Sequence, residues 1–196
     1  MKKPAAVGID VGGTKTLCVL VDKHFKQLEE IKFKTAPEEG EHRFTRRLKD
    51  SVGALVNSAK AKGLDVVAVG VGSAGSVDDK EIKITTSPNL LMLEDYPIGK
   101  HLGKVVKAKM TIGNDVQTGI HGEHVLGAAK GCTNVMGVFF GTGVGGAAII
   151  NGQLYTGASG FGGRLGCAFR RGLRFGRGND LENFVTHDAR SFCTCG

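Results

Sequence analysis

Three short apolar runs, bounded by polar residues and glycines, open the chain in a pattern typical of β-strands. The runs lie at 5–11, 16–22 and 28–35. Gly12 and Gly13 separate the first two runs and predict a tight turn between them. We therefore expect three adjacent strands at the start of the fold.

A long amphipathic helix is predicted after these strands, over 41–62. Its apolar side chains recur at helical spacing beneath a charged opposite face. They are Phe44, Leu48, Val52, Leu55, Val56 and Ala59. Gly63 is suited to end the helix, because glycine adopts the left-handed backbone of a helix stop without strain.

A continuous apolar run at 66–75 then predicts a strand that is buried on both faces. Two more extended runs and a helix follow, at 80–86, 109–115 and 96–107. The last strand brings Asn114 and Asp115 to its carboxyl end, where ligands usually bind in open α/β sheets. Together these elements predict an α/β domain over 1–115.

A second α/β domain is expected to begin over 116–196. Its predicted elements are a helix at 116–129 and hairpin strands at 135–141 and 145–151. Asn151 and Gly152 favour another tight turn, because this dipeptide suits the left-handed backbone of a two-residue hairpin loop.

Glycine content and net charge refine this picture. The 31 glycines indicate many tight turns and places where the backbone approaches a ligand closely, as phosphate sites require. The net charge of +7 raises nucleic acid as a partner, but six arginines against three acidic residues from Arg164 onward supply nearly half of it. We interpret that bias as a solvated end of the chain and expect no nucleic-acid partner.

Neither a secretory signal nor a membrane span is expected. The chain reaches Asp10 before the apolar core of a signal peptide could form. The uncharged stretch at 135–163 is too rich in glycine and polar side chains for a spanning helix. A cytoplasmic protein without a membrane partner is therefore predicted.

The first glycine-rich turn is a candidate phosphate site. Gly12 and Gly13 let backbone N–H groups face an anion, Thr14 adds a hydroxyl donor, and Lys15 closes the motif. Asp10 repels a phosphate, so it is better explained as a Mg²⁺ ligand, bound directly or through water. A plain hairpin with an exposed aspartate explains these residues equally well.

Gly141, Thr142 and Gly143 begin a second glycine-rich turn, which formally fits the dinucleotide pattern G-x-G-x-x-G. That pattern should open a helix and be followed by an acidic residue about 20 positions later. Here a β-type run follows, and no acidic residue occurs before Asp180. A second phosphate-binding hairpin fits better, and two such turns facing each other could clamp a nucleoside triphosphate.

Asn114 and Asp115 suit a base that accepts the proton of an attacking hydroxyl while the amide orients a neighbouring group. A side-chain cap at the start of the next helix is an equally physical interpretation and could coexist with it. Asn89, in the loop 87–90, is by itself more often a turn residue than a ligand.

Two patterns suggest metal sites only weakly. His121 and His124 lie three positions apart, which is not the spacing of a zinc-binding HExxH helix, so solvent-facing histidines are the simpler interpretation. Cys193 and Cys195 are too few for a closed zinc site, because such a site needs four ligands.

Taken in order, several motifs resemble the successive signatures of the ROK family, which groups bacterial sugar kinases with related transcriptional repressors. They are DVGGTK at 10–15, GSAGSVD at 72–78, SPNL at 87–90, GND at 113–115, GTGVGGAAIINGQLYTGASGFGG at 141–163 and CTCG at 193–196. The resemblance implies an actin/hexokinase-like ATPase (ribonuclease H-like) α/β fold, with the first domain complete and the second incomplete. It also implies that ATP and a hexose such as glucose bind in a cleft between the domains, and a homodimer is compatible with it.

The resemblance assigns roles by position. It implies that 10–15 and 141–146 bind the phosphates of ATP. Asn89 and Asn114 match sugar-contacting amides, and Asp115 matches the catalytic base that takes the proton of the sugar hydroxyl. The implied function is ATP-dependent phosphorylation of a hexose, with Mg²⁺ on the phosphates.

Some positions depart from the family pattern. Arg164 and Cys167 stand where the resemblance implies a sugar-binding glutamate and a histidine that contacts both the sugar and a structural zinc. A third cysteine is also expected beyond Cys193 and Cys195, so the ligand set for Zn²⁺ is incomplete. The alternative function is a truncated, non-catalytic ROK-like protein that retains partial sugar and phosphate binding. A repressor is disfavoured, because a DNA-binding domain does not fit ahead of Asp10.

Overall fold

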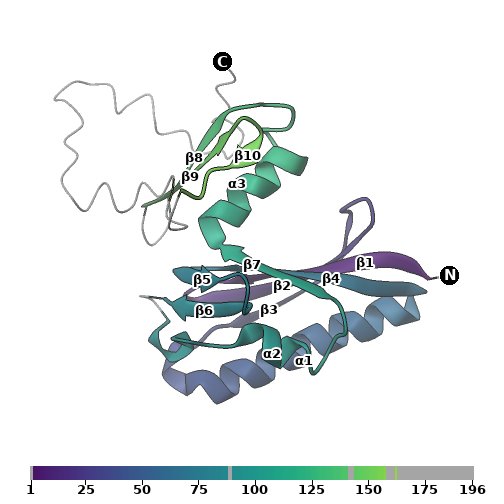
Figure 1. The fold of residues 1–196 in the computed structure, drawn as a ribbon. Coiled ribbons are helices and arrows are strands. Elements are labelled where there is room, and N and C mark those ends of the chain that lie inside the picture. Colours follow the sequence, from purple (N-terminus) through teal and green to yellow (C-terminus); the bar gives the residue numbers. More distant parts are fainter. Residues whose placement is uncertain (1, 88–89, 141–143, 158–161, 163–196) are drawn as a thin grey trace. The chain divides into compact units, whose positions relative to one another are not determined.

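The computed structural model describes residues 2–87, 90–140, 144–157 and 162. The chain divides into two compact units, 1–115 and 116–196. Each unit has its own β-sheet and its own cluster of buried apolar residues, and Figure 1 labels the elements.

A five-stranded sheet with the order β3-β2-β1-β4-β7 forms the centre of the first unit (Figure 1). Its strands are β1 (Lys3–Val11), β2 (Lys15–Asp22), β3 (Gln27–Lys34), β4 (Leu64–Ser73) and β7 (Lys109–Asn114). The first three form an antiparallel meander, which confirms the strands predicted at the start of the chain. β4 runs parallel to both β1 and β7, so the carboxyl ends of these three strands share one edge of the sheet.

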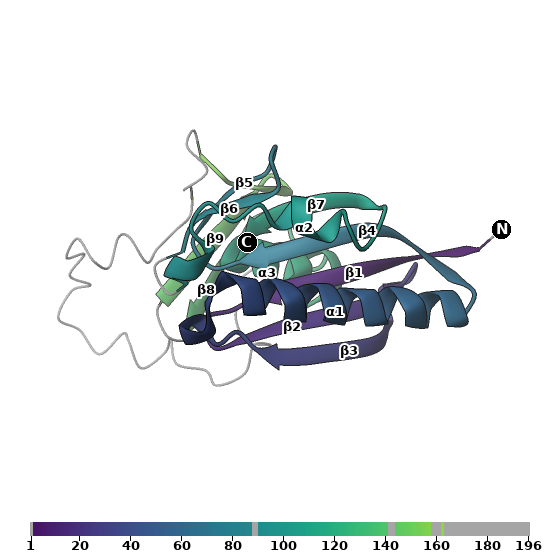
Figure 2. The same cartoon turned by 90° about the horizontal axis from the view of Figure 1, so that it is seen from below.

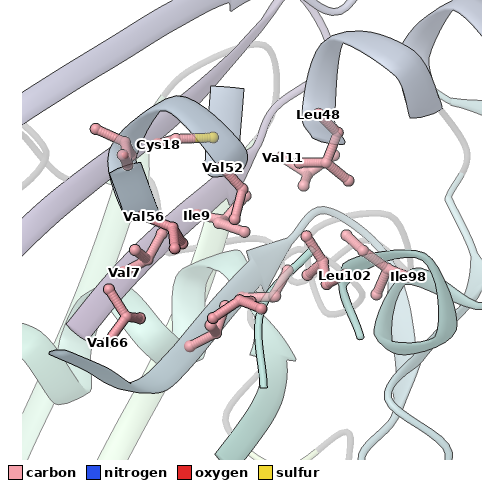
Figure 3. Packing of buried hydrophobic residues seen from close by; sticks show 14 of the residues in the cluster. Val7, Ile9, Val11, Cys18, Leu48, Val52, Val56, Val66, Ile98 and Leu102 are labelled. Atoms are coloured by element: carbon pink, nitrogen blue, oxygen red, sulfur yellow. The ribbon is translucent and has the colours of Figure 1, made fainter. Parts of the chain in front are cut away.

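Helix α1 (Gly40–Ala61) covers one face of this sheet, and α2 (Ile98–Leu102) lies on the same face (Figures 1 and 2). The apolar side chains predicted to line the long helix are all buried. Figure 3 shows Leu48, Val52 and Val56 of α1 facing alternate side chains of β1. Four residues advance a helix by about 6 Å and two residues advance a strand by about 6.7 Å. The two apolar rows therefore stay in contact along the helix.

The prediction that β4 is buried on both faces was wrong. Val69 and Val71 on the α1 side are buried, whereas Val67, at the register shift between β1 and β4, is 48% exposed. The opposite face carries Gly70 and Gly72, which are only partly buried. The run looks uniformly apolar in the sequence because glycine is not polar, but glycine brings no side chain that needs to be buried.

α2 is shorter than the helix predicted at 96–107. Tyr96 cannot begin a helix, because its backbone N–H and C=O pair with Ile84 at 2.9 and 3.0 Å. Pro97 precedes the first helical turn and Gly103 follows the last one. The remaining short elements of this unit are β5 (Ser76–Asp78), β6 (Lys83–Thr86) and two 3₁₀ turns, η1 (Pro37–Glu39) and η2 (Leu91–Leu93).

The second unit contains α3 (Asp115–Leu126), which starts at the unit boundary, and a sheet with the order β10-β9-β8. Its strands are β8 (Val135–Phe140), β9 (Val144–Ile150) and β10 (Gln153–Leu154). The predicted hairpin is confirmed. Asn151 and Gly152, with φ angles of 54° and 75°, form the predicted left-handed turn between β9 and β10.

None of the described helices combines the length and the apolar character that crossing a membrane requires. α1 is the longest of them, and its outer face is charged.

Candidate functional site

The carboxyl ends of β1, β4 and β7 bring polar side chains of the candidate site together. Asp10 of β1 is the register partner of Gly72 in β4, which is the partner of Gly113 in β7. The next row consists of Val11, Ser73 and Asn114, and Asp115 follows it in the chain. Gly72 and Gly113 carry no side chains that could cover Asp10, and Asp10 is exposed to solvent.

The Asn114 side chain orients its neighbour in the sequence. It is 6% exposed, and its Nδ2 donates to the Asp115 Oδ1 at 2.8 Å and to the Gly75 carbonyl at 3.0 Å. Asp115 also lies in the first turn of α3, where backbone N–H groups favour a negative charge. This position therefore suits a helix start and an oriented carboxylate base at the same time.

The electrostatics of Asp10 reflect a second carboxylate nearby. Partial desolvation raises the pKa of Asp10 above its ordinary 3.8, the negative charge of Asp115 raises the pKa further, and Lys15 lowers it by a smaller amount. Two carboxylates that repel each other at one edge favour a cation between or beside them. Oxygen ligands of this kind are those that Mg²⁺ prefers, so the residues present fit the predicted ion, with Asp10 as its holder.

The turn between β1 and β2 is tied to the end of β3 by two threonines that are fully buried, Thr16 and Thr35. Thr35 Oγ1 donates to the Gly12 carbonyl at 2.7 Å and lies 3.0 Å from Thr16 Oγ1. The Thr35 N–H donates to the Thr14 carbonyl at 3.0 Å, and the Gly12 N–H donates to the Lys15 carbonyl at 3.1 Å. The carbonyl oxygens of Gly12, Thr14 and Lys15 therefore all accept hydrogen bonds from protein donors. The engaged carbonyls are compatible with an anion at the turn, but the Gly12 N–H is itself bonded to the Lys15 carbonyl and does not face an anion as predicted.

Sequence reasoning missed Thr16, Thr35 and Gly75. The threonines lie in or beside predicted strands, where β-branched residues are ordinary and carry no functional signal. Their partners lie 19 and 23 positions away in the chain, so only the folded meander reveals the bonds. Gly75 belongs to the motif at 72–78, but the motif alone does not say which of its residues contacts Asn114.

Several predicted site residues lie outside the described residues. These are Asn89, Gly141, Thr142, Gly143, Cys193 and Cys195. The second glycine-rich turn joins two strands as expected, since β8 ends at Phe140 and β9 begins at Val144. Its contacts with phosphate, and those of Asn89 with sugar, stay predictions.

A metal site at the α3 histidines finds no support. His121 is exposed, and the His124 Nε2 donates to the Cys132 carbonyl at 2.8 Å, which is a structural role. Within the described ranges no group of three or more His, Cys, Asp or Glu side chains could hold a metal ion.

Comparison with known proteins relates this chain to the ROK family. A model of the ROK family matches residues 6–196. A glucokinase of Thermotoga maritima is 31% identical over 166 residues, which make up 85% of this chain and 51% of that protein. The crystal structure of a ROK family glucokinase from Streptomyces griseus, in complex with glucose and AMPPNP, has a TM-score of 0.70 and 30% identity, covering 83% of this chain and 49% of that one.

A ROK hexokinase from Thermus thermophilus has a TM-score of 0.68 and 29% identity, covering 83% of this chain and 52% of that one. These likenesses bear out the predicted α/β fold of the actin/hexokinase-like ATPase type. The chain spans about half the length of the curated relatives it matches.

Proposed function

Because this chain belongs to the ROK family, we propose that it takes part in the ATP-dependent phosphorylation of a hexose, glucose or a related sugar. The observation that carries the proposal is the meeting of Asp10, Asn114 and Asp115 at the carboxyl edge of β1, β4 and β7. Phosphoryl transfer depends mainly on positioning and on charge neutralisation, and this edge offers groups for both.

Asp115 is the proposed general base. Its carboxylate accepts the proton of the sugar hydroxyl that attacks the γ-phosphate of ATP. The Asn114 Nδ2 holds one of its oxygens at 2.8 Å, so the orientation of the carboxylate is fixed before the sugar arrives. A buried amide at this position also offers a hydrogen-bonding group to a neighbouring sugar hydroxyl.

Asp10 is the proposed holder of Mg²⁺, bound directly or through water. Mg²⁺ would neutralise charge that develops on the phosphates of ATP. Gly12, Gly13, Thr14 and Lys15 form the turn proposed to bind those phosphates, with Gly141, Thr142 and Gly143 as the predicted second phosphate loop. Zn²⁺ has no part in this proposal.

The test is Asp115→Asn, which keeps the shape of the side chain and removes the base. We expect the rate of ATP-dependent glucose phosphorylation by the purified chain to fall by about a hundredfold or more. Asp50→Asn, on the exposed face of α1, is the matched control and should keep full activity. Undiminished turnover by Asp115→Asn would remove Asp115 as the base.

A second candidate is a non-catalytic protein that binds the sugar without turning it over. Arg164 and Cys167, at positions where the family resemblance implies a glutamate and a histidine, favour this alternative. Calorimetric titration of the chain with glucose, run beside the phosphorylation assay, separates the two. Binding without phosphorylation would support the second candidate, and robust turnover would eliminate it.

A further inference from the structure

A cavity of about 250 Å³ lies in the first unit, between α1, the start of β4 and the segment that leads into β7. Its apolar lining consists of Val56, Val66, Val105 and Val106. The distance along β4 from Val66 to Gly72 is about 20 Å at the usual rise of a strand. The cavity is therefore remote from the candidate site at the carboxyl ends of the strands.

The cavity exists because the pairing between β4 and β7 starts late. β4 pairs with β1 from its first residue, but with β7 only from Ala68 onward. Val105 and Val106, which precede β7, donate their N–H groups to the Leu102 carbonyl of α2 at 2.8 and 3.0 Å. The end of α2 therefore engages donors that could otherwise pair with β4, and a gap remains beside the start of β4.

The apolar lining of this gap is held in place by the core of the first unit. Val56, Val66 and Val106 are only 5–7% exposed. A methyl group at Gly53 of α1 would lie 3.5 Å from the Val105 Cγ1, so α1 closes the gap on that side. Since an apolar cavity of about 150 Å³ binds benzene, this cavity is large enough for one substituted ring.

The rim of the cavity carries charges that the protein itself does not pair. Lys60, Asp65 and Lys107 are exposed, and within the part of the chain that the structure describes none of them forms an ion pair or a side-chain hydrogen bond. Lys62, by contrast, forms an ion pair with Glu29 at 3.2 Å. Two cations and one carboxylate leave a single net positive charge at the rim, which suits a monoanion better than a nucleotide or a phosphate ester.

From these features we propose that the cavity binds a small organic monoanion, a carboxylate attached to one ring or to a short branched chain. The apolar body of the ligand contacts the valines, and its carboxylate lies between the ammonium groups of Lys60 and Lys107. Asp65 disfavours a second negative charge on the ligand. This inference does not depend on the proposed function, because the cavity shares no residue with 10–15 or 113–115.

The first test is an NMR titration of the full chain with benzoate, at constant pH and ionic strength. The backbone amide signals of Val66 and Val106 should shift and saturate below about 20 mM, since so small a ligand gains only modest affinity. Benzamide, which keeps the ring and lacks the charge, should bind about fivefold more weakly. No saturable shift with benzoate, or equal binding of benzamide, would overturn the proposal.

Charge changes at the rim should act in opposite directions. Lys60→Gln combined with Lys107→Gln should weaken benzoate binding about fivefold, whereas Asp65→Asn should strengthen it about twofold. The control is Lys23→Gln combined with Lys32→Gln, which makes the same change in net charge at exposed positions of the β2–β3 hairpin. It should leave the affinity unchanged, and an equal loss in both double variants would refute a site at the cavity.

Filling the cavity gives a further measurement. Val105 is only partly buried, and Val105→Phe adds a ring where the ring of benzoate is expected. Benzoate should then no longer shift the Val66 signal, and normal binding by a folded Val105→Phe chain would contradict the proposal. If this variant does not fold, the charge variants decide the question. A failure to phosphorylate glucose would remove the proposed function and leave all of these outcomes in force.

Discussion

The two units fill their interiors in opposite ways. In the first unit, large side chains of α1 such as Leu48 and Leu55 are fully buried against the sheet, and the core runs along the whole helix. In the described part of the second unit, the buried cluster is small and contains Ile120, Ala129, Cys132, Val135, Ala147 and Ile149. Close approach of α3 to its sheet there depends on glycines.

The space around individual glycines differs between the two sheets. A methyl group at Gly137 of β8 would overlap the Ile120 side chain of α3, and one at Gly145 of β9 would overlap Val116. At Gly8 of β1, in the first unit, an added methyl would meet nothing within 4 Å. Where helix meets sheet, the first unit should therefore be sensitive to the removal of atoms from large side chains, and the second to the addition of atoms at its glycines.

The largest effect is expected from Leu48→Ala. Leu48 is fully buried beneath the sheet, so the change removes apolar contacts and leaves a cavity. The free energy of unfolding should fall by about 2–5 kcal/mol, measured by denaturant unfolding. Leu91→Ala, at a position that is 75% exposed, should change it by less than about 0.5 kcal/mol. Equal effects of the two changes would contradict the described core.

Gly137→Ala tests the opposite sensitivity in the second unit. The added methyl must push Ile120 aside, which should cost about 1–3 kcal/mol of unfolding free energy. Gly8→Ala adds the same group to a strand of the first unit and should be tolerated. The comparison fails if Gly8→Ala proves to be the more damaging of the two.

Thr35→Val tests whether the turn at 12–15, proposed to bind phosphate, depends on the buried Thr35 hydroxyl. Valine keeps the shape but removes the bond to the Gly12 carbonyl and the partner of the Thr16 hydroxyl. We expect a loss of about 1–3 kcal/mol of unfolding free energy and a higher KM for ATP. Thr111→Val, an exposed threonine of β7, is the control and should change neither quantity. If Thr35→Val lowers the stability but leaves the KM for ATP unchanged, the Thr35 hydroxyl has no role in nucleotide binding.

The smallest effect concerns the pKa of Asp10. Because this pKa is raised in the folded chain, ionised Asp10 costs stability at neutral pH, and that cost is relieved as the pH falls through the raised value toward 3.8. Asp115→Asn removes the negative charge that contributes to the raised pKa of Asp10. The pKa of Asp10 should therefore fall toward 3.8, and the pH dependence of the stability should weaken. A ¹³C NMR titration of the Asp10 carboxyl measures the change, with Asp50→Asn as control. An unchanged pKa would mean that the two carboxylates do not interact.

Much of the first unit could be predicted because its elements have strong local signals. The spacing of apolar residues in α1 and the glycine that follows it identified the helix and its end. Asp10, Asn114 and Asp115 could be placed at strand ends, and parallel strands bring such ends to one edge. The pairing of Tyr96 with Ile84, which shortens α2, gave no local signal, because its partner lies 12 positions earlier in a separate strand.

The sequence by itself determined which segments become strands and helices and which polar residues stand at their ends, because hydrophobic periodicity and turn residues act over a few positions. Only the tertiary structure decided that Thr35 holds the turn between β1 and β2, that Gly75 contacts both Asn114 and the end of β6, and that one face of β4 stays partly exposed. These features depend on hydrogen bonds and packing between residues that are distant in the chain. Such residues become neighbours only when the strands assemble into the sheet.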